Sequence, residues 1–206
     1  MGKQIYMRSL TNRLRRQGQI LVIIVALLWI LEILDQFIFG RQLDFYGIQP
    51  RTFAGLRHIF FAPFLHGGFG HLIANTIPFI VLGWFVMLRR TGDFFRVSII
   101  AGLVSGLGVW LFGAANSTHI GISGVIFGYL GYLLFRGYLE RSLQSIFLAI
   151  LAIFFYGGML WGIFPTQTGV SWLGHLFGLL GGVLAAYLMT DRRHTIPISL
   201  PKISTK

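Results

Sequence analysis

A single serine stands in a long apolar stretch of the chain, and its neighbours suggest what it could do. In the segment NSTHIGISGVIFGYLGYLLFRG, Ser123 lies between Gly121 and Gly124. A serine hydroxyl becomes a strong nucleophile when a nearby base takes its proton. The candidate base is His175, which interrupts a second apolar stretch, SWLGHLFGLLGG. These residue types predict a serine hydrolase with a Ser123–His175 dyad.

A second group of polar residues lies in the segment HGGFGHLIANT, which contains His66, His71 and Asn75. Acyl transfer passes through an oxyanion, which must be stabilised by preorganised hydrogen-bond donors. The candidate donors are the Ser123 backbone N–H, the Asn75 amide and the His71 imidazole, and we place Gly121 in the same oxyanion region. We expect His66 to support this region without taking part in the chemistry.

The elements that must position these residues are expected to be membrane spans. Of the 206 residues, 55% are hydrophobic and 11% are charged, whereas an average soluble domain has about 25% charged residues. A helix of about 20 apolar residues is long enough to cross a bilayer. Six stretches are predicted as spans: 20–39, 71–88, 94–115, 122–135, 142–164 and 170–189. The expected fold class is therefore all-α, a polytopic membrane bundle of six transmembrane helices.

The fourth predicted span, 122–135, is too short to cross the whole hydrocarbon core. We therefore expect its helix to begin inside the membrane, below a polar dip at residues 116–119. Ser123 would then lie at a helix N-terminus, where backbone N–H groups lack intrahelical acceptors. The positive end of the helix dipole would favour an oxyanion at the same place.

Depth in the membrane can be counted from the charge that ends each span. At about 1.5 Å per residue, Asn75, Ser123 and His175 lie roughly 21, 20 and 24 Å from the cytoplasmic ends of their helices. The three groups are thus expected at one level, inside a core about 30 Å thick.

Small residues follow both members of the predicted dyad at helical spacing. Gly124 and Gly128 form one small-xxx-small face, and Gly174, Gly178 and Gly182 form another. Such faces let two helices approach closely. The two helices could therefore bring the serine of one within reach of the histidine of the other.

The positions of the basic residues predict the orientation of the chain. Fourteen of the 17 Lys and Arg residues fall on one side of the predicted spans; the exceptions are Arg41, Arg51 and Arg57 in the first loop. Because positive charge concentrates on the cytoplasmic side, both termini are expected there. The net charge of +11 is accordingly read as a topology signal beside the lipid bilayer, and no nucleic-acid partner is expected.

The chain is expected to contain one membrane domain, residues 20–189, between two basic cytoplasmic tails, residues 1–19 and 190–206. Neither tail is long enough to bury a core. The long loop between the first two spans mixes aromatic residues with arginine and proline, and we expect it to lie in the membrane interface. The chain has no cysteine, so thiolate chemistry is unavailable, and we expect no metal or other cofactor.

The motifs together resemble those of the rhomboid family of intramembrane serine proteases. GISG around Ser123 resembles the family's GxSG motif, HGGFGHLIAN resembles its two histidines followed by an asparagine, and GHLFGLLGG resembles its catalytic histidine with a GxxxG face. The segment GIQPR resembles one common in bacterial members. The resemblance implies that Ser123 is the nucleophile, His175 the base, and His71 and Asn75 oxyanion stabilisers.

The resemblance also implies the reaction and the location. It predicts an endopeptidase that cleaves transmembrane protein substrates in or beside their membrane segments, in the inner membrane of a bacterium. The sequence does not fix the oligomeric state. Two features depart from the family pattern: Phe127 stands where many members have tyrosine, and the first loop lacks a Trp-Arg pair. We expect the Phe127 ring to stack on His175.

Several alternatives remain open at the level of sequence. His119 is nearer to Ser123 along the chain and could compete as the base, whereas Ser105 in GLVSGLG is read as a helix-packing residue. A metalloprotease could use His66, His71 and His175 as ligands, although there is no HExxH motif. A catalytically inactive rhomboid-like binding factor and a small transporter are the non-enzymatic alternatives.

Overall fold

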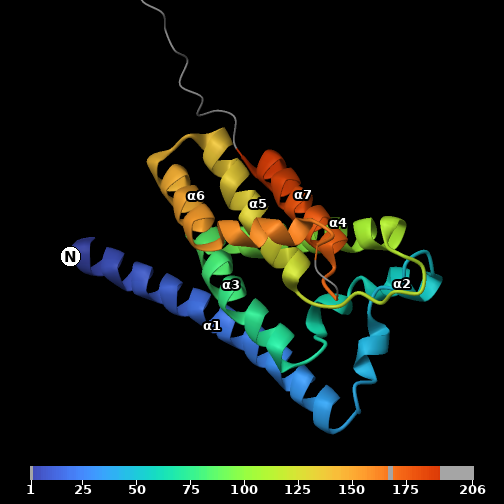
Figure 1. The fold of residues 1–206 in the computed structure, drawn as a ribbon. Helices are drawn as coiled ribbons and strands as arrows, with labels where there is room; N and C mark the ends of the chain where they lie inside the picture. Colours follow the sequence, from blue (N-terminus) through green and yellow to red (C-terminus); the bar gives the residue numbers. More distant parts are fainter. Residues whose placement is uncertain (1, 167–168, 191–206) are drawn as a thin grey trace, which may run out of the picture.

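The computed structural model describes residues 2–166 and 169–190, and this part of the chain is a bundle of helices (Figure 1). The α-helices are α1 (Gly2–Phe37), α2 (Phe53–His58), α3 (Phe69–Met87), α4 (Thr91–Phe112), α5 (Ser123–Glu140), α6 (Leu143–Tyr156) and α7 (Trp172–Met189). Short 3₁₀ helices are η1 (Leu43–Tyr46), η2 (Ala62–Phe64) and η3 (Gly157–Ile163). The all-α fold class is confirmed.

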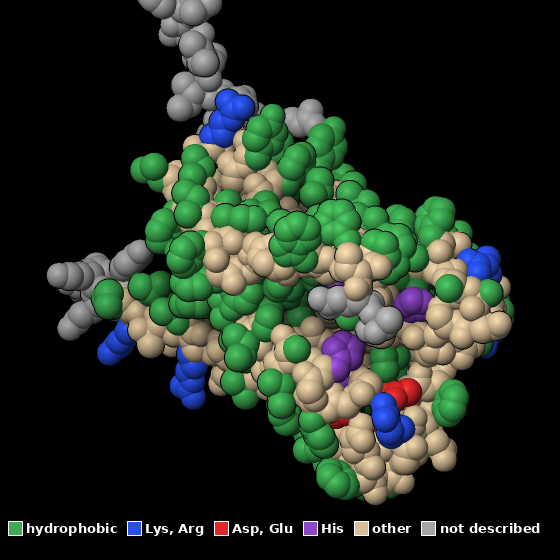
Figure 2. All heavy atoms as spheres, viewed as in Figure 1, with side chains coloured by type: hydrophobic (Ala, Val, Ile, Leu, Met, Phe, Trp, Pro, Cys, Tyr) green, Lys and Arg blue, Asp and Glu red, His purple; other side chains and the backbone are tan. Residues whose placement is uncertain are grey.

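Within the described residues, five helices are long and apolar enough to cross a membrane. They are Met7–Phe37 of α1, α3, α4, the continuous segment Leu143–Ile163 of α6 and η3, and α7. Many large hydrophobic side chains are exposed, and they spread over much of the face seen in Figure 2, as expected for a surface that meets lipid. Six spans were predicted, but only five of the described helices are long and apolar enough, because α5 is not among them.

The fourth span differs from the prediction in length. The sequence suggested a short helix over 122–135, but α5 has 18 residues and continues to Glu140, a length of about 27 Å. The prediction was wrong because Arg136 was taken as the charge that ends the span. The Arg136 side chain is instead buried, and its Nη2 lies 2.9 Å from a carboxylate oxygen of Glu140. A charge neutralised in this way does not end a helix.

The beginning of α5 agrees with the predicted position of Ser123. The helix starts at this serine, and the preceding segment is irregular, with a left-handed backbone at Asn116 and at Gly121. An antiparallel backbone pair then fixes this segment to the first loop. The Ile48 N–H donates to the His119 carbonyl at 2.8 Å, and the His119 N–H donates to the Ile48 carbonyl at 3.0 Å.

The region expected as an N-terminal tail is helical. α1 runs without interruption from Gly2 through the first span, and two of its polar residues reach the C-terminal end of α3. Gln17 donates to the Met87 carbonyl at 2.9 Å, and Arg13 donates to the carbonyls of Met87, Leu88 and Arg89. These bonds satisfy carbonyl groups that have no partner inside a helix. Residues 191–206 of the expected C-terminal tail lie outside the described residues.

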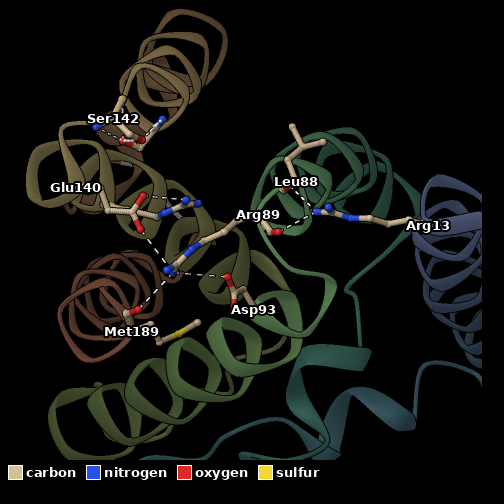
Figure 3. A network of polar contacts seen from close by, with 9 residues as sticks. Arg13, Leu88, Arg89, Asp93, Glu140, Ser142 and Met189 are labelled. Carbon is tan, nitrogen blue, oxygen red and sulfur yellow. Dashed lines mark hydrogen bonds and ion pairs between the residues drawn. The ribbon is translucent and has the colours of Figure 1, made fainter. Parts of the chain in front are cut away.

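α5 forms the centre of the bundle. It packs most extensively against α7 and also contacts α6, α4 and α3 (Figure 1). At the end opposite Ser123, a polar network joins four helices (Figure 3). Arg89, which follows α3, lies 3.5 Å from a carboxylate oxygen of Glu140 and 4.0 Å from one of Asp93, and it donates to the Met189 carbonyl at 3.3 Å. Arg13 and Met189 therefore lie on the same side of the bundle.

Candidate active site

The structure brings Ser123 and His175 into direct contact. Ser123 is the first residue of α5, His175 lies in the first turn of α7, and Ser123 Oγ is 2.8 Å from His175 Nε2. The other ring nitrogen, Nδ1, lies 2.9 Å from the Gly162 carbonyl oxygen. A carbonyl only accepts hydrogen bonds, so Nδ1 must carry the ring proton. Nε2 is then free to accept the Ser123 hydroxyl proton, which is the tautomer that a general base requires.

Sequence reasoning missed Gly162. The residue types predicted only a dyad, because a backbone carbonyl leaves no trace in residue identity. The position has little room, because a Cβ on Gly162 would lie 3.1 Å from His175 Nδ1 and 3.1 Å from Phe127 Cζ. A glycine among the large apolar residues of GGMLWGIF was the one available signal of such a close approach.

Phe127 packs against a face of the His175 imidazole. Its ring stacks on that of His175 with a centroid separation of 4.1 Å and an interplanar angle of 8°. This ring comes from the turn of α5 that follows the nucleophile. The imidazole is thus held by stacking, by Gly162 and by the Ser123 hydroxyl.

The candidate oxyanion donors converge next to Ser123. Gly121 has φ of 112°, and a Cβ there would lie 2.9 Å from His71 Nε2 and 3.8 Å from Asn75 Nδ2. The Asn75 amide nitrogen is buried and has no hydrogen-bond partner among the described residues. The Gly67 N–H makes a long bond of 3.5 Å to His71 Nδ1, which favours a proton on Nε2, the nitrogen that faces Gly121.

The start of α5 adds a backbone donor. Ser123 and Gly124 are its first residues, so their N–H groups have no acceptor within the helix. Only a glycine fits at 121 without strain, because the backbone there is left-handed and the His71 ring occupies the place of a Cβ. The site therefore offers several hydrogen-bond donors beside one hydroxyl.

His66 lies behind the oxyanion region. Its ring meets that of His71 edge-on, with a centroid separation of 5.1 Å, and the residue is 1% exposed. Burial, with a smaller contribution from nearby His71, lowers the pKa of His66 to about 4. His66 is therefore neutral near pH 7, and the structure places it in contact with His71 and not with the dyad.

The predicted glycine faces bring α5 and α7 together. A Cβ on Gly178 would collide with the Gly124 carbonyl, and one on Gly182 would collide with the Gly128 carbonyl. Ser105 of α4 lies beside this interface, where its hydroxyl donates to the Gly174 carbonyl of α7 at 2.8 Å. This contact agrees with its interpretation as a packing residue.

A cavity of about 980 Å³ opens over the site. His71, Asn75, Ser123 and His175 line it, with Arg41 and Asp44 also in its wall. Figure 2 shows histidine side chains on this face, with acidic and basic side chains nearby. The Ser123 hydroxyl is therefore reached through this cavity.

The structure also bears on two alternatives that the sequence left open, namely His119 as the base and a metal site. His119 lies in the cavity wall, but its Nδ1 is 2.7 Å from Ser171 Oγ and its Nε2 is 2.8 Å from Ser117 Oγ, so it bonds other serines than Ser123. Within the described part of the chain, no three His, Cys, Asp or Glu side chains gather as metal ligands would. His175, one of the three ligands in the metalloprotease alternative, bonds Ser123 and the Gly162 carbonyl.

Comparison with known proteins relates the part of the chain that contains the site to one family. A family model described as Rhomboid domain matches residues 54–192, more than half of the chain. "Uncharacterized protein Rv1337" of Mycobacterium tuberculosis is 42% identical over 181 residues, which cover 84% of this chain and 75% of that protein. "Uncharacterized protein ML1171" of Mycobacterium leprae is 39% identical over 191 residues, with coverages of 87% and 75%. "RHOMBOID-like protein 4" of Arabidopsis thaliana is 26% identical over 136 residues, with coverages of 63% and 33%.

Proposed function

The chain belongs to the rhomboid family, and on that premise we propose that it is an intramembrane serine endopeptidase. The proposed reaction is hydrolysis of a peptide bond in or beside a transmembrane segment of a protein substrate, through the Ser123–His175 dyad. The observation that carries the proposal is the 2.8 Å contact between Ser123 Oγ and His175 Nε2, with Nδ1 occupied by the Gly162 carbonyl.

The geometry supports a two-step acyl transfer. Ser123 Oγ attacks the carbonyl carbon of the scissile bond while its proton passes to His175 Nε2. The carbonyl oxygen becomes negatively charged and accepts hydrogen bonds from the Asn75 amide, the His71 imidazole and the Ser123 N–H. The tetrahedral intermediate collapses, and the leaving amine takes the proton from Nε2. A water molecule then attacks the acyl-enzyme as His175 takes a proton from it, which restores the serine.

The Gly162 carbonyl takes the part that a carboxylate plays in a serine-protease triad. It fixes the tautomer and orientation of the imidazole by accepting from Nδ1. It carries no full charge, so it stabilises the imidazolium less than a carboxylate would. A carbonyl is also cheaper to bury in a membrane than an ionised acid.

The apolar surface of the bundle favours a class of substrate that is itself embedded in the membrane. Ser123 stands at the start of α5, within a bundle whose surface is largely apolar. A substrate must present an extended backbone to the hydroxyl, so a helical membrane segment has to unwind locally. We expect small or helix-weakening residues at the cleaved bond, because they lower the cost of unwinding.

We infer further that both termini face the cytoplasm. Arg13, Arg89 and Met189 lie at the same end of the bundle. The sequence predicts that most of its basic residues lie in the tails and connections on that side. The cavity with Ser123 would then open to the opposite side. A reporter domain that is active only in the cytoplasm should be active when it is fused to either terminus. A reporter that is active only outside the cytoplasm should be inactive at both, and activity at either end would contradict this orientation.

The proposed activity is tested with a purified single-span model substrate in liposomes. Wild type should cleave it, whereas Ser123→Ala and His175→Ala should not, since each removes one member of the dyad. Ser98→Ala is the matched control, because this serine also lies in an apolar helix but bonds the Phe94 carbonyl and the Tyr129 hydroxyl. Equal cleavage by wild type and both dyad variants would refute the proposal. Substrate binding without any cleavage by wild type would favour an inactive rhomboid-like binding factor.

A further inference from the structure

A second pair of serine and histidine lies in the wall of the same cavity. His119, from the segment before α5, and Ser171, which precedes α7, are joined by a contact of 2.7 Å between Nδ1 and Oγ. The first residue is four positions before the nucleophile, and the second is four positions before the candidate base. The pair therefore connects the two segments that carry the dyad.

The hydrogen bonds determine the tautomer of His119. The Ser117 hydroxyl donates its proton to the Ala114 carbonyl at 2.7 Å, so Ser117 Oγ can only accept from His119 Nε2 at 2.8 Å. Nε2 therefore carries the ring proton, and Nδ1 accepts from the Ser171 hydroxyl. Three hydrogen bonds thus join the Ala114 carbonyl, Ser117, His119 and Ser171 in one series, and the last of them holds the Ser171 hydroxyl.

Backbone bonds extend this link in both directions. His119 is fixed to Ile48 of the first loop by the two bonds described above. On the other side, the Ser171 carbonyl accepts from the His175 N–H at 3.1 Å, which is the first turn of α7. A displacement of Ser171 would consequently move the backbone of His175 with it.

We propose that His119 is a positioning residue that holds the start of α7, through Ser171, so that His175 Nε2 stays within hydrogen-bond distance of Ser123 Oγ. The inference rests on the proposed function, because it concerns the same dyad. It assigns His119 no contact with the substrate and no proton transfer. The role as competing base that the sequence left open is replaced by one exerted through the helix that carries the base.

Ser171 itself is not assigned as a nucleophile. The donors of the Asn75 amide and the His71 imidazole converge beside Gly121 and Ser123. An attack by Ser171 would place the oxyanion away from these groups.

Burial also lowers the pKa of His119, which keeps the ring neutral and its series of hydrogen bonds intact near pH 7.

The test measures the reactivity of Ser123 separately from substrate binding. A fluorophosphonate labels an activated serine when Oγ attacks phosphorus and fluoride leaves. His119→Phe and Ser171→Ala should each slow labelling of Ser123 about tenfold or more, since misplacing a reacting group by about 1 Å can cost 10²-fold. His119→Asn should restore most of the rate, because its amide oxygen can accept from the Ser171 hydroxyl. With the model substrate, kcat should fall while KM stays near the wild-type value.

Two further measurements separate positioning from a general structural role. The effects of His119→Phe and Ser171→Ala should be strongly non-additive in the double variant, because both break the same link. Ser171→Ala should keep the wild-type melting temperature. Because this substitution removes only one hydroxyl group, it remains informative even if His119→Phe does not fold.

The outcomes distinguish this inference from the proposed function. Failure of wild type to label at Ser123 would refute the proposed function. Normal labelling of Ser123 in both variants, beside a labelled wild type, would refute only the role of His119. Labelling rates that fall only in step with the melting temperature, or an adduct mapped to Ser171, would also overturn it.

Discussion

Among single residues, Asn75 shows how a stability cost can indicate function. Its amide nitrogen is buried and has no hydrogen-bond partner among the described residues. An unsatisfied buried donor costs about 1–3 kcal/mol of folding free energy. The cost is recovered if the donor meets negative charge that develops during a reaction. The position of this nitrogen, directed toward Gly121, agrees with that interpretation.

Replacing Asn75 should therefore affect catalysis and stability differently. Asn75→Ala should lower kcat about 10²- to 10³-fold, the usual loss for one oxyanion donor. The melting temperature should stay the same or rise slightly, because an unsatisfied donor is removed. Steady-state kinetics and thermal unfolding of the same detergent preparation measure both. A kcat within twofold of wild type would remove Asn75 from the oxyanion region.

His66 gives a prediction about pH. Its pKa is about 4 in the folded protein and 6.5 in an unfolded chain. Between these values the unfolded state binds more protons, so the free energy of unfolding should decrease as the pH falls from 6.5 to 4. Above 6.5 and below 4 this residue should contribute no slope. His66→Gln should flatten the dependence in that window, as measured by thermal unfolding. Parallel profiles for wild type and variant would contradict the burial of a neutral imidazole.

Among the elements, the pair of α5 and α7 sets the geometry of the dyad. Their backbones approach so closely that Gly178 and Gly182 face carbonyl groups of α5 directly. Small residues permit this approach, and dispersion contacts along the interface then hold the helices. Because Ser123 and His175 lie near the starts of these two helices, the distance between the helices determines the distance between the reacting atoms.

A methyl group in this interface should therefore separate the dyad. Gly178→Ala would collide with the Gly124 carbonyl, and we expect about 1–3 kcal/mol of lost unfolding free energy from overpacking. Fluorophosphonate labelling of Ser123 should slow as well, because His175 lies one turn earlier on the displaced helix.

Gly92→Ala is the matched control for this change. It also adds one methyl group to a helical glycine, but no neighbouring atom lies within 4 Å of the new Cβ. Its stability and labelling rate should stay at or above the wild-type values. If both alanine variants behaved alike, close packing of α5 on α7 would not be what positions the dyad.

At the scale of the whole molecule, the end of the bundle opposite Ser123 is fixed by charge (Figure 3). Arg136 is 4% exposed and Glu140 is 15% exposed in their side chains, with 2.9 Å between them. Glu140 also lies 3.5 Å from Arg89, so it has a second cationic partner. The network holds α5 to the segments around α3, α4 and α7, which fixes how the helices are aligned along the bundle.

Breaking this pair should be asymmetric. Glu140→Met leaves the buried Arg136 charge unpaired and should lower the free energy of unfolding by about 3–5 kcal/mol. Arg136→Met should cost less, because Glu140 keeps Arg89 as a partner. The double variant should recover part of the loss, since no unpaired buried charge remains from the pair. Denaturant unfolding of the three variants measures the cycle, and equal losses in both single variants would contradict the assignment.

The sequence by itself determined the membrane fold class and the candidate residues of the site. A hydrocarbon environment excludes most polar residues from spans, so Ser123, His175, His71 and Asn75 stood out by residue type alone. Glycine spacing likewise predicted that two helices pack closely, because small residues at that spacing have few other uses in a membrane.

Only the tertiary structure decided which partners complete the site. The Gly162 carbonyl bonds His175, and Ser171 bonds His119, through contacts between segments far apart along the chain. A backbone carbonyl is present in every residue, so its role depends entirely on where packing places it. The same holds for Arg136, whose charge ended the predicted span but is neutralised by Glu140 inside the bundle. Residue types determine which chemistry is possible, whereas the packing of the helices determines which groups meet.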